Sequence, residues 1–200
     1  MPRKKRLTDA AVLAAAGRVF GRIGPARFTL ADVAEEAGLA PATLVQRFGS
    51  KRALMLAFAE HAASLAREPF EEARTRVAEP LGALRAALCI ASRATKGRQE
   101  LTHSLAFLLE DLADEELRAH AARHARWTEA SIRELLDCAV ERGELASHDT
   151  ARLARALQAA WNGALIQWAL RGRGSLGAWT AAVVDTLLEP LVIGARRVAS

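Results

Sequence analysis

The chain has 200 residues, 51% of them hydrophobic and 26% charged, which is typical of a globular protein with one large domain or a small domain joined to a larger one. No stretch of 18 apolar residues is free of charge, which excludes a transmembrane helix, and we expect a cytoplasmic protein with no membrane partner. The net charge of +5 belongs entirely to residues 1–60, where ten lysines and arginines stand against five acids. Such a basic end on a neutral body predicts either a polyanion partner or a solvated basic tail.

The first helix is expected to begin at Thr8 or Asp9, either of which can cap it, and to stop at Gly24-Pro25. Nearly the whole chain is predicted to be helical, because alanine, leucine, arginine and glutamate dominate it. Alternating runs of β-branched and aromatic residues, which would indicate strands, are missing.

Two short helices are expected to follow. Thr29 can cap the first of them, Asp32 completes a variant of the capping box, and Gly38 ends it as a residue that tolerates a positive φ. Pro41 suits the first turn of the next helix, where its missing N–H is not needed, and that helix is expected to reach Phe48.

A long helix is expected to begin after a cap at Ser50 and to run to about Glu68, where Pro69 follows. The remainder is predicted to form a second, larger helical bundle. Its helices are expected over about residues 80–95, 102–113, 114–142, 149–170 and 175–197, the last of them bent at Pro190.

The segment 29–48, TLADVAEEAGLAPATLVQRF, has the spacing of a helix-turn-helix. The small Ala34 lets two helices approach closely, Gly38 makes the turn, and Leu39 and Leu44 fill the space between the helices. The outer face of the second helix then remains free to enter a DNA major groove. Its residues are Pro41, Ala42, Thr43, Gln46 and Arg47. The alternative is a compact helical hairpin without a DNA partner.

The polar side chains of this face suit DNA. Arg47 and Gln46 carry donors and acceptors for base edges, and Thr43 can contact a phosphate or a thymine methyl group. Lys51 lies at the start of the following helix, where free N–H groups and the helix dipole favour an anion. We therefore expect Lys51 to bind a DNA phosphate.

From Leu13 to Phe58 the sequence resembles the N-terminal domain of the tetracycline-repressor (TetR/AcrR) family of bacterial regulators. The matching segments are A-x3-F at residues 16–20, Gly24, and FTLADVAEEAGLAPATLVQRFGSKRALM, in which Phe48-Gly49-Ser50-Lys51 with Leu54 is the most specific part. The resemblance implies DNA contacts at nine positions, namely Thr29, Ala31, Pro41, Ala42, Thr43, Val45, Gln46, Arg47 and Lys51.

Three positions depart from the family pattern. Members usually have a tyrosine where this chain has Val45, often a histidine where it has Arg47, and frequently a serine cap where it has Ala40. These departures are expected to change the preferred DNA sequence and not the fold.

The resemblance also implies an all-α protein of two domains. The helix-turn-helix DNA-binding domain is expected over residues 1–52, with a linking helix over about 51–68. Residues 53–200 are expected to form a helical domain that binds a small effector and holds two subunits together.

A dimer interface is expected on the last two helices, which carry three of the four tryptophans. Two such helices from each subunit can form a four-helix bundle. The candidates are Leu157, Ala164, Leu165, Trp168, Trp179, Val183, Leu187 and Leu191. The alternative is that these side chains fill the core of their own domain.

An effector pocket is expected between the middle helices, apolar with a few polar groups. The candidates are Leu84, Leu88, His103, Phe107, Leu108, Trp127, Ser131, Leu135, Trp161 and Asn162. Plain core packing is the alternative for each aliphatic residue.

Neither a metal, a cofactor nor an enzymatic activity is expected. His120 and His124 have a spacing that can bind metal, but no third ligand is evident, and surface histidines are the simpler interpretation. Cys89 and Cys138 lack zinc-site spacing and are expected to be buried small hydrophobic residues, with a redox switch as the alternative. Phosphate-loop, G-x-S-x-G and H-E-x-x-H motifs are missing.

Together these features predict a homodimeric transcriptional regulator, a repressor that a small effector releases from a palindromic double-stranded DNA operator. The alternative is an all-helical binding or adaptor protein whose basic end binds no specific DNA sequence.

Overall fold

The computed structural model describes residues 7–93 and 95–193. Their regular structure is ten α-helices and one 3₁₀ helix, apart from an isolated bridge between Leu145 and Val192. The helices are α1 (Asp9–Ile23), α2 (Leu30–Glu36), α3 (Pro41–Phe48), α4 (Lys51–Ser64), α5 (Glu68–Arg76), α6 (Pro80–Ser92), α7 (Arg98–Ala113), α8 (Glu115–Glu141), α9 (Thr150–Arg171), α10 (Leu176–Leu188) and η1 (Glu189–Leu191). The predicted all-α fold is confirmed.

These helices form two compact units. Unit 1 contains α1–α4, α7 and α8 as far as His124, and unit 2 contains α5, α6, the rest of α8, α9, α10 and η1. The units are defined by packing alone, so the functional boundary predicted at residue 52 stays a prediction. Within the described ranges, no helix is long and apolar enough to cross a membrane.

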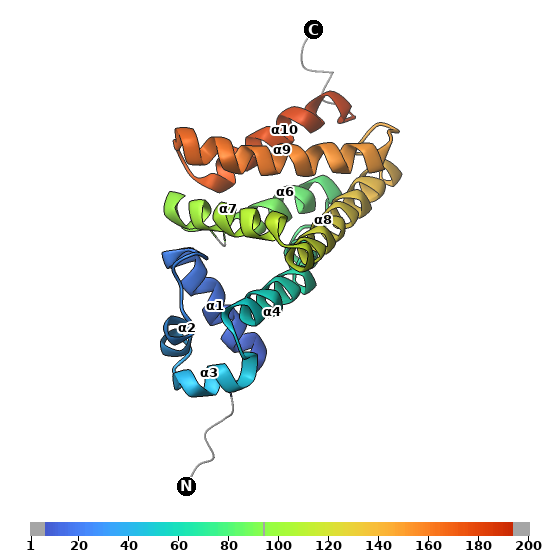
Figure 1. The fold of residues 1–200 in the computed structure, drawn as a ribbon. Helices are drawn as coiled ribbons and strands as arrows, with labels where there is room; N and C mark the ends of the chain where they lie inside the picture. Colours follow the sequence, from blue (N-terminus) through green and yellow to red (C-terminus); the bar gives the residue numbers. More distant parts are fainter. Residues whose placement is uncertain (1–6, 94, 194–200) are drawn as a thin grey trace. The chain divides into compact units, whose positions relative to one another are not determined.

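In unit 1, α1 packs against α2, α4 and α7, and α3 packs against α2 and α4 (Figure 1). The core of this unit is aromatic. Phe20 contacts the rings of Phe28, Phe58 and Phe107, with centroids 4.4, 4.8 and 5.5 Å away. Because Phe107 belongs to α7, a segment far along the chain completes the core around the first helices.

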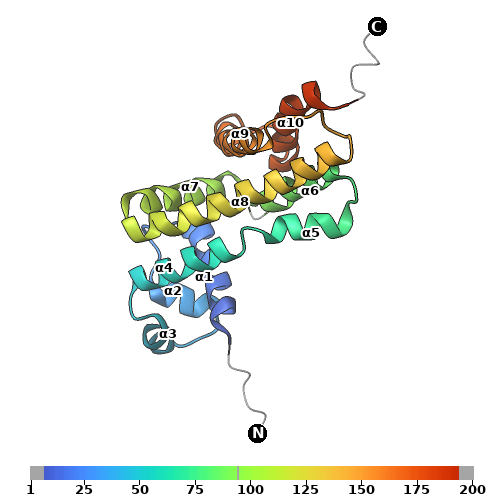
Figure 2. The same cartoon turned by 90° about the vertical axis from the view of Figure 1, so that its right-hand side faces the viewer.

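In unit 2, α5 packs on α6, and α10 packs on both α6 and α9 (Figure 2). Its core is largely aliphatic. The most deeply buried side chains include Leu84, Leu88, Ile132, Leu136, Leu157 and Leu188. The core of unit 2 therefore differs in composition from the aromatic core of unit 1.

The predicted ends of the fourth and of the last helix are wrong, and so is the predicted start of α7, which begins at Arg98 and not at about residue 102. The fourth helix ends at Ser64, and Pro69 lies in the first turn of α5, which the sequence did not predict. A proline is tolerated there because the first N–H groups of a helix have no partner within the helix. The last α-helix ends at Leu188, and Pro190 lies in η1, because proline removes a donor and clashes with the preceding turn. Residues 194–197 of the predicted helix lie outside the described residues.

Candidate nucleic-acid interface

The start of α2 is fixed by a complete capping box. The Thr29 hydroxyl accepts from the N–H of Asp32 at 3.2 Å, and the Asp32 carboxylate accepts from the N–H of Thr29 at 2.7 Å. These hydrogen bonds with Thr29 lower the pKa of Asp32 below its ordinary value. The predicted cap is confirmed, and it sets the direction in which α2 leaves the preceding loop.

The turn between α2 and α3 depends on Gly38, whose φ is 65°. The N–H of Gly38 donates to the carbonyl of Glu35 at 3.0 Å, and the N–H of Leu39 donates to that of Ala34 at 2.8 Å. Ala34 and Leu44 are fully buried between the helices. The spacing noted in the sequence therefore produces a helix-turn-helix.

The second helix of this motif, α3, presents a polar and exposed face. Pro41 lies in its first turn, and Ala40 before it provides no side-chain cap, as expected. Of the nine predicted DNA contacts, seven are exposed: Thr29, Ala31, Pro41, Ala42, Val45, Gln46 and Arg47. Thr43 and Lys51 are half-buried. The motif thus brings all nine positions to α3 and to the starts of α2 and α4.

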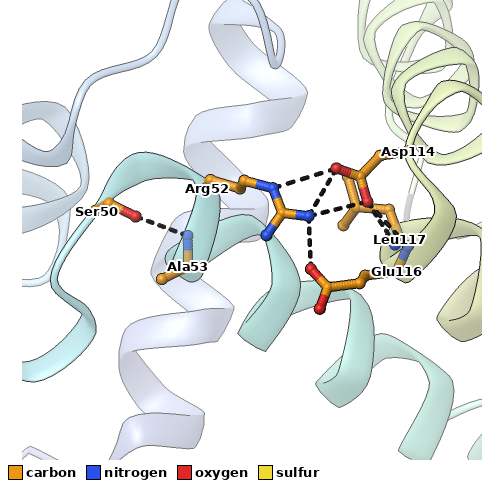
Figure 3. A network of polar contacts seen from close by, with 6 residues as sticks. All are labelled: Ser50, Arg52, Ala53, Asp114, Glu116 and Leu117. Carbon is orange, nitrogen blue, oxygen red and sulfur yellow. Dashed lines mark hydrogen bonds and ion pairs between the residues drawn. The ribbon is translucent and has the colours of Figure 1, made fainter.

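Lys51 is anchored within unit 1. Its ammonium donates to the carbonyl of Ala26 at 3.0 Å and lies 4.3 Å from the centroid of the Phe28 ring. Ser50 caps α4 as predicted, because its hydroxyl accepts from the N–H of Ala53 at 3.1 Å (Figure 3). An ammonium group has three donors, so a fixed Lys51 keeps capacity for a phosphate.

Arg47 has an intramolecular partner that the sequence did not predict. Its Nε donates to Oδ1 of Asp9 at 2.9 Å, and its Nη2 donates to the same oxygen. Asp9 is the first residue of α1, so the carboxylate reaches α3 from another helix.

Two further ion pairs that the sequence did not predict join the first turn of α4 to the start of α8 (Figure 3). Nη2 of Arg52 donates to Asp114 at 2.8 Å and to Glu116 at 2.5 Å. Glu116 and Asp114 raise the pKa of Arg52, and the N–H of Leu117 together with Arg52 lowers the pKa of Asp114. Only Asp114 carried a sequence signal, because aspartate directly before a helix is a preferred cap.

The match to a known family covers this motif. Residues 12–58 match the family model described as bacterial regulatory proteins, tetR family. These residues extend from Val12 in α1 to Phe58 in α4 and therefore contain the helix-turn-helix. No curated protein matches the sequence of the chain.

Solved structures share the fold over nearly the whole chain. A regulator from Saccharomonospora viridis, in complex with choline, has a TM-score of 0.74 and 24% identity, covering 91% of this chain and 96% of its own. SmeT, the repressor of the Stenotrophomonas maltophilia multidrug efflux pump SmeDEF, has a TM-score of 0.68 and 21% identity, covering 95% and 93%. PfmR from Thermus thermophilus has a TM-score of 0.63 and 24% identity, covering 88% and 96%.

The predicted effector-pocket residues are divided between the units. His103, Phe107 and Leu108 lie in unit 1, which also contains the segment that matches the tetR-family model. Nδ1 of His103 lies 2.7 Å from the carbonyl oxygen of Gly21, and Phe107 belongs to the aromatic core. These two side chains therefore have structural roles in unit 1.

The other pocket candidates lie in unit 2. Leu84, Leu88, Ser131 and Leu135 are buried, Trp161 is half-buried, and Trp127 and Asn162 are exposed. Ser131 Oγ and Trp161 Nε1 are themselves buried with no hydrogen-bond partner within the described residues.

The predicted dimer residues also differ in exposure. Leu157, Ala164 and Trp168 are buried, and Leu157 belongs to the aliphatic core of unit 2. Leu165, Trp179, Val183 and Leu191 are half-buried, and Leu187 is exposed. Ile166 and Leu170 of α9 are exposed apolar residues that the sequence did not single out. The dimer interface stays a prediction.

One expectation about the minor candidates is wrong. Cys138 is exposed, because it lies to the side of the buried face of α8 that Ile132, Leu136 and Ala139 form, whereas Cys89 is half-buried. His120 Nδ1 lies 2.5 Å from Nη2 of Arg123. Across the described ranges, no three histidine, cysteine or acidic side chains are grouped to hold a metal.

Proposed function

We propose that the chain is a DNA-binding transcriptional regulator that acts as a cytoplasmic repressor. The observation that carries this proposal is the helix-turn-helix of the segment that matches the tetR-family model, whose α3 leaves a polar face exposed beside the fixed Lys51. A face of this kind enters the major groove, while cations at neighbouring helix starts bind the phosphates. The assignment includes no catalytic role.

Repression and effector binding are supported by relatives of the same fold. SmeT represses an efflux pump, and the Saccharomonospora viridis regulator was found with choline. In this chain, Ser131 and Trp161 supply buried polar atoms that lack a partner within the described residues, and such atoms gain free energy when a bound molecule pairs with them. The effector is therefore proposed to bind in unit 2.

The regulator is proposed to act as a homodimer on a palindromic operator. Two α3 helices related by twofold symmetry reach successive major grooves about 34 Å apart. Exposed apolar residues of α9 and α10, including Leu170 and Leu187, support a second copy as the partner.

The test is selection of bound duplexes from a library of random double-stranded DNA by the full chain. We expect enrichment of a near-palindromic sequence. Gln46→Ala, which changes an exposed side chain, is expected to weaken binding of that sequence by about 1–3 kcal/mol. Lys51→Ala is expected to weaken binding of all sequences and to reduce the salt slope by about 0.9.

Arg171→Ala is the matched control, because it removes one exposed positive charge from unit 2. It is expected to leave both affinity and salt slope unchanged. If no sequence is enriched, the proposal fails and the all-helical adaptor becomes the better interpretation. If Gln46→Ala and Lys51→Ala both bind like the original chain, the assigned interface is wrong.

A further inference from the structure

Arg47 is held in place although it lies on the exposed face of α3. Although the residue as a whole is exposed, only 25% of its side-chain surface is exposed, whereas 69% of that of Asp9 is exposed. Both hydrogen bonds from Arg47 end on one oxygen of Asp9, which lies 38 positions earlier in the chain. The centroid of the Phe48 ring lies 6.0 Å from the guanidinium carbon. The guanidinium is thus fixed by contacts from two helices.

The contacts with Asp9 occupy one edge of the guanidinium group. This group is planar and has five N–H donors in a rigid fork, so fixing the Nε–Nη2 edge also fixes the direction of the other donors. Nη1 of Arg47 has no hydrogen-bond partner in residues 7–93 and 95–193. The fork formed by Nη1 and the second N–H of Nη2 is therefore available in a set orientation.

We propose that Asp9 is a positioning residue for DNA recognition, which holds Arg47 so that this fork reads a base edge with two acceptors. Guanine fits best, because its O6 and N7 accept the two N–H groups of an arginine fork. This inference rests on the proposed function as a DNA-binding regulator. It adds a specificity-determining residue outside the helix-turn-helix itself.

Because Asp9 is negatively charged, we expect it to improve discrimination between base pairs and not the affinity for DNA in general. A carboxylate beside the DNA repels every phosphate, so it weakens binding to all sequences. Holding the guanidinium in its reading orientation improves binding only where the correct base pair is present. Removal of Asp9 therefore has opposite effects on general affinity and on discrimination.

The test begins with the sequence that the unaltered chain enriches from random double-stranded DNA. Arg47→Ala identifies the base pair whose preference depends on the arginine. Asp9→Asn is then expected to reduce the preference at that same base pair about fivefold or more, and to leave the preferences at other positions intact. In the Arg47→Ala background, Asp9→Asn is expected to change the preference no further.

Glu35→Gln is the matched control, since it removes one exposed acid from α2 in the same unit. It is expected to leave the preference unchanged. The cap of α1 is Thr8, which Asp9→Asn leaves in place, so the variant is expected to fold, and a thermal melt followed by circular dichroism checks this.

Three results overturn the proposal. The first is that Asp9→Asn raises affinity for all sequences equally and leaves discrimination intact, which would make Asp9 a competitor of phosphate. Asp9→Asn with unchanged preference, or Arg47→Ala with no effect on any base preference, also overturns it. Failure of the unaltered chain to enrich any sequence is a different result, because it overturns the proposed function together with this inference.

Discussion

The cores of the two units are built from different side chains. In unit 1, three phenylalanine rings contact that of Phe20, whereas unit 2 packs mainly leucine, isoleucine, valine and alanine. Phe70 of unit 2 is as buried as Phe20, with exposed fractions of 2% and 4%. Among the described residues, however, Phe70 has no aromatic ring in contact.

This difference separates two ways of holding helices together. Ring pairs have preferred separations and angles, so the aromatic core fixes the orientation of α1 relative to α4 and α7. An aliphatic core gains free energy mostly from the area that it buries, with little dependence on orientation. The free energy of packing in the unit that carries the helix-turn-helix therefore depends more strongly on how its helices are oriented.

The largest expected effect is the loss of Phe20. Phe20→Ala is expected to lower the free energy of unfolding by about 3–5 kcal/mol, because it leaves a cavity and removes three ring contacts. Phe70→Ala is expected to cost about 1 kcal/mol less, because it removes no ring pair. Urea denaturation followed by circular dichroism measures both, and equal losses would show that the ring contacts add nothing beyond burial.

The next effect concerns Asp111 of α7, which is 8% exposed and whose Oδ1 has no partner within the described residues. Burial raises its pKa to about 6. The folded chain therefore binds an extra proton between about pH 4 and pH 6, and stability falls as the pH rises through this window. Asp111→Asn is expected to stabilise the protein by about 1–2 kcal/mol at pH 7.5 and to have no such effect near pH 4.

Glu110→Gln is the control for this measurement, because Glu110 is the exposed neighbour of Asp111 on α7. Denaturation curves of both variants at the two pH values separate the loss of a buried charge from the loss of a surface charge. A gain from Asp111→Asn that is equal at both pH values would contradict the assignment.

The smallest effect tests unit 2. Ser131 Oγ is buried without a partner in the described part of the chain, so Ser131→Ala is expected to raise the free energy of unfolding by about 1 kcal/mol. Affinity for DNA is expected to stay the same. A destabilised Ser131→Ala variant would show that the hydroxyl is paired, for instance with water. The core of unit 2 would then depend on a polar interaction as well as on aliphatic burial.

The sequence predicted the starts of α1 to α4 well, because each is marked locally, but it placed the start of α7 about four residues too late, where Gly97 provides no side-chain cap. Thr8, Thr29 and Ser50 each accept a backbone N–H at the start of their helix, and Pro41 lies in the first turn of α3. The start of α5 was missed because Pro69 was taken as the end of the preceding helix. A proline has the same local signature after one helix and at the start of the next.

The ion pairs of the candidate site could not be predicted from the sequence. Asp9 and Arg47 are 38 positions apart, and Arg52 and Asp114 are 62 apart. No local spacing relates such residues, because their contact depends on how the helices pack. The same limit applies to Leu157 and Leu187, since helical periodicity identifies both as apolar but only the packing buries the first and exposes the second.

The position of Phe107 has a consequence for the exchange of domains between proteins. The segment that matches the tetR family ends at residue 58, yet the rings of Phe20 and Phe58 are covered by a side chain of α7. A chimera that takes only the first 65 residues would leave these two rings facing water or a foreign surface. The part of the chain that must be transferred together is therefore discontinuous in sequence. A functional chimera must contain α7 as well as the first four helices.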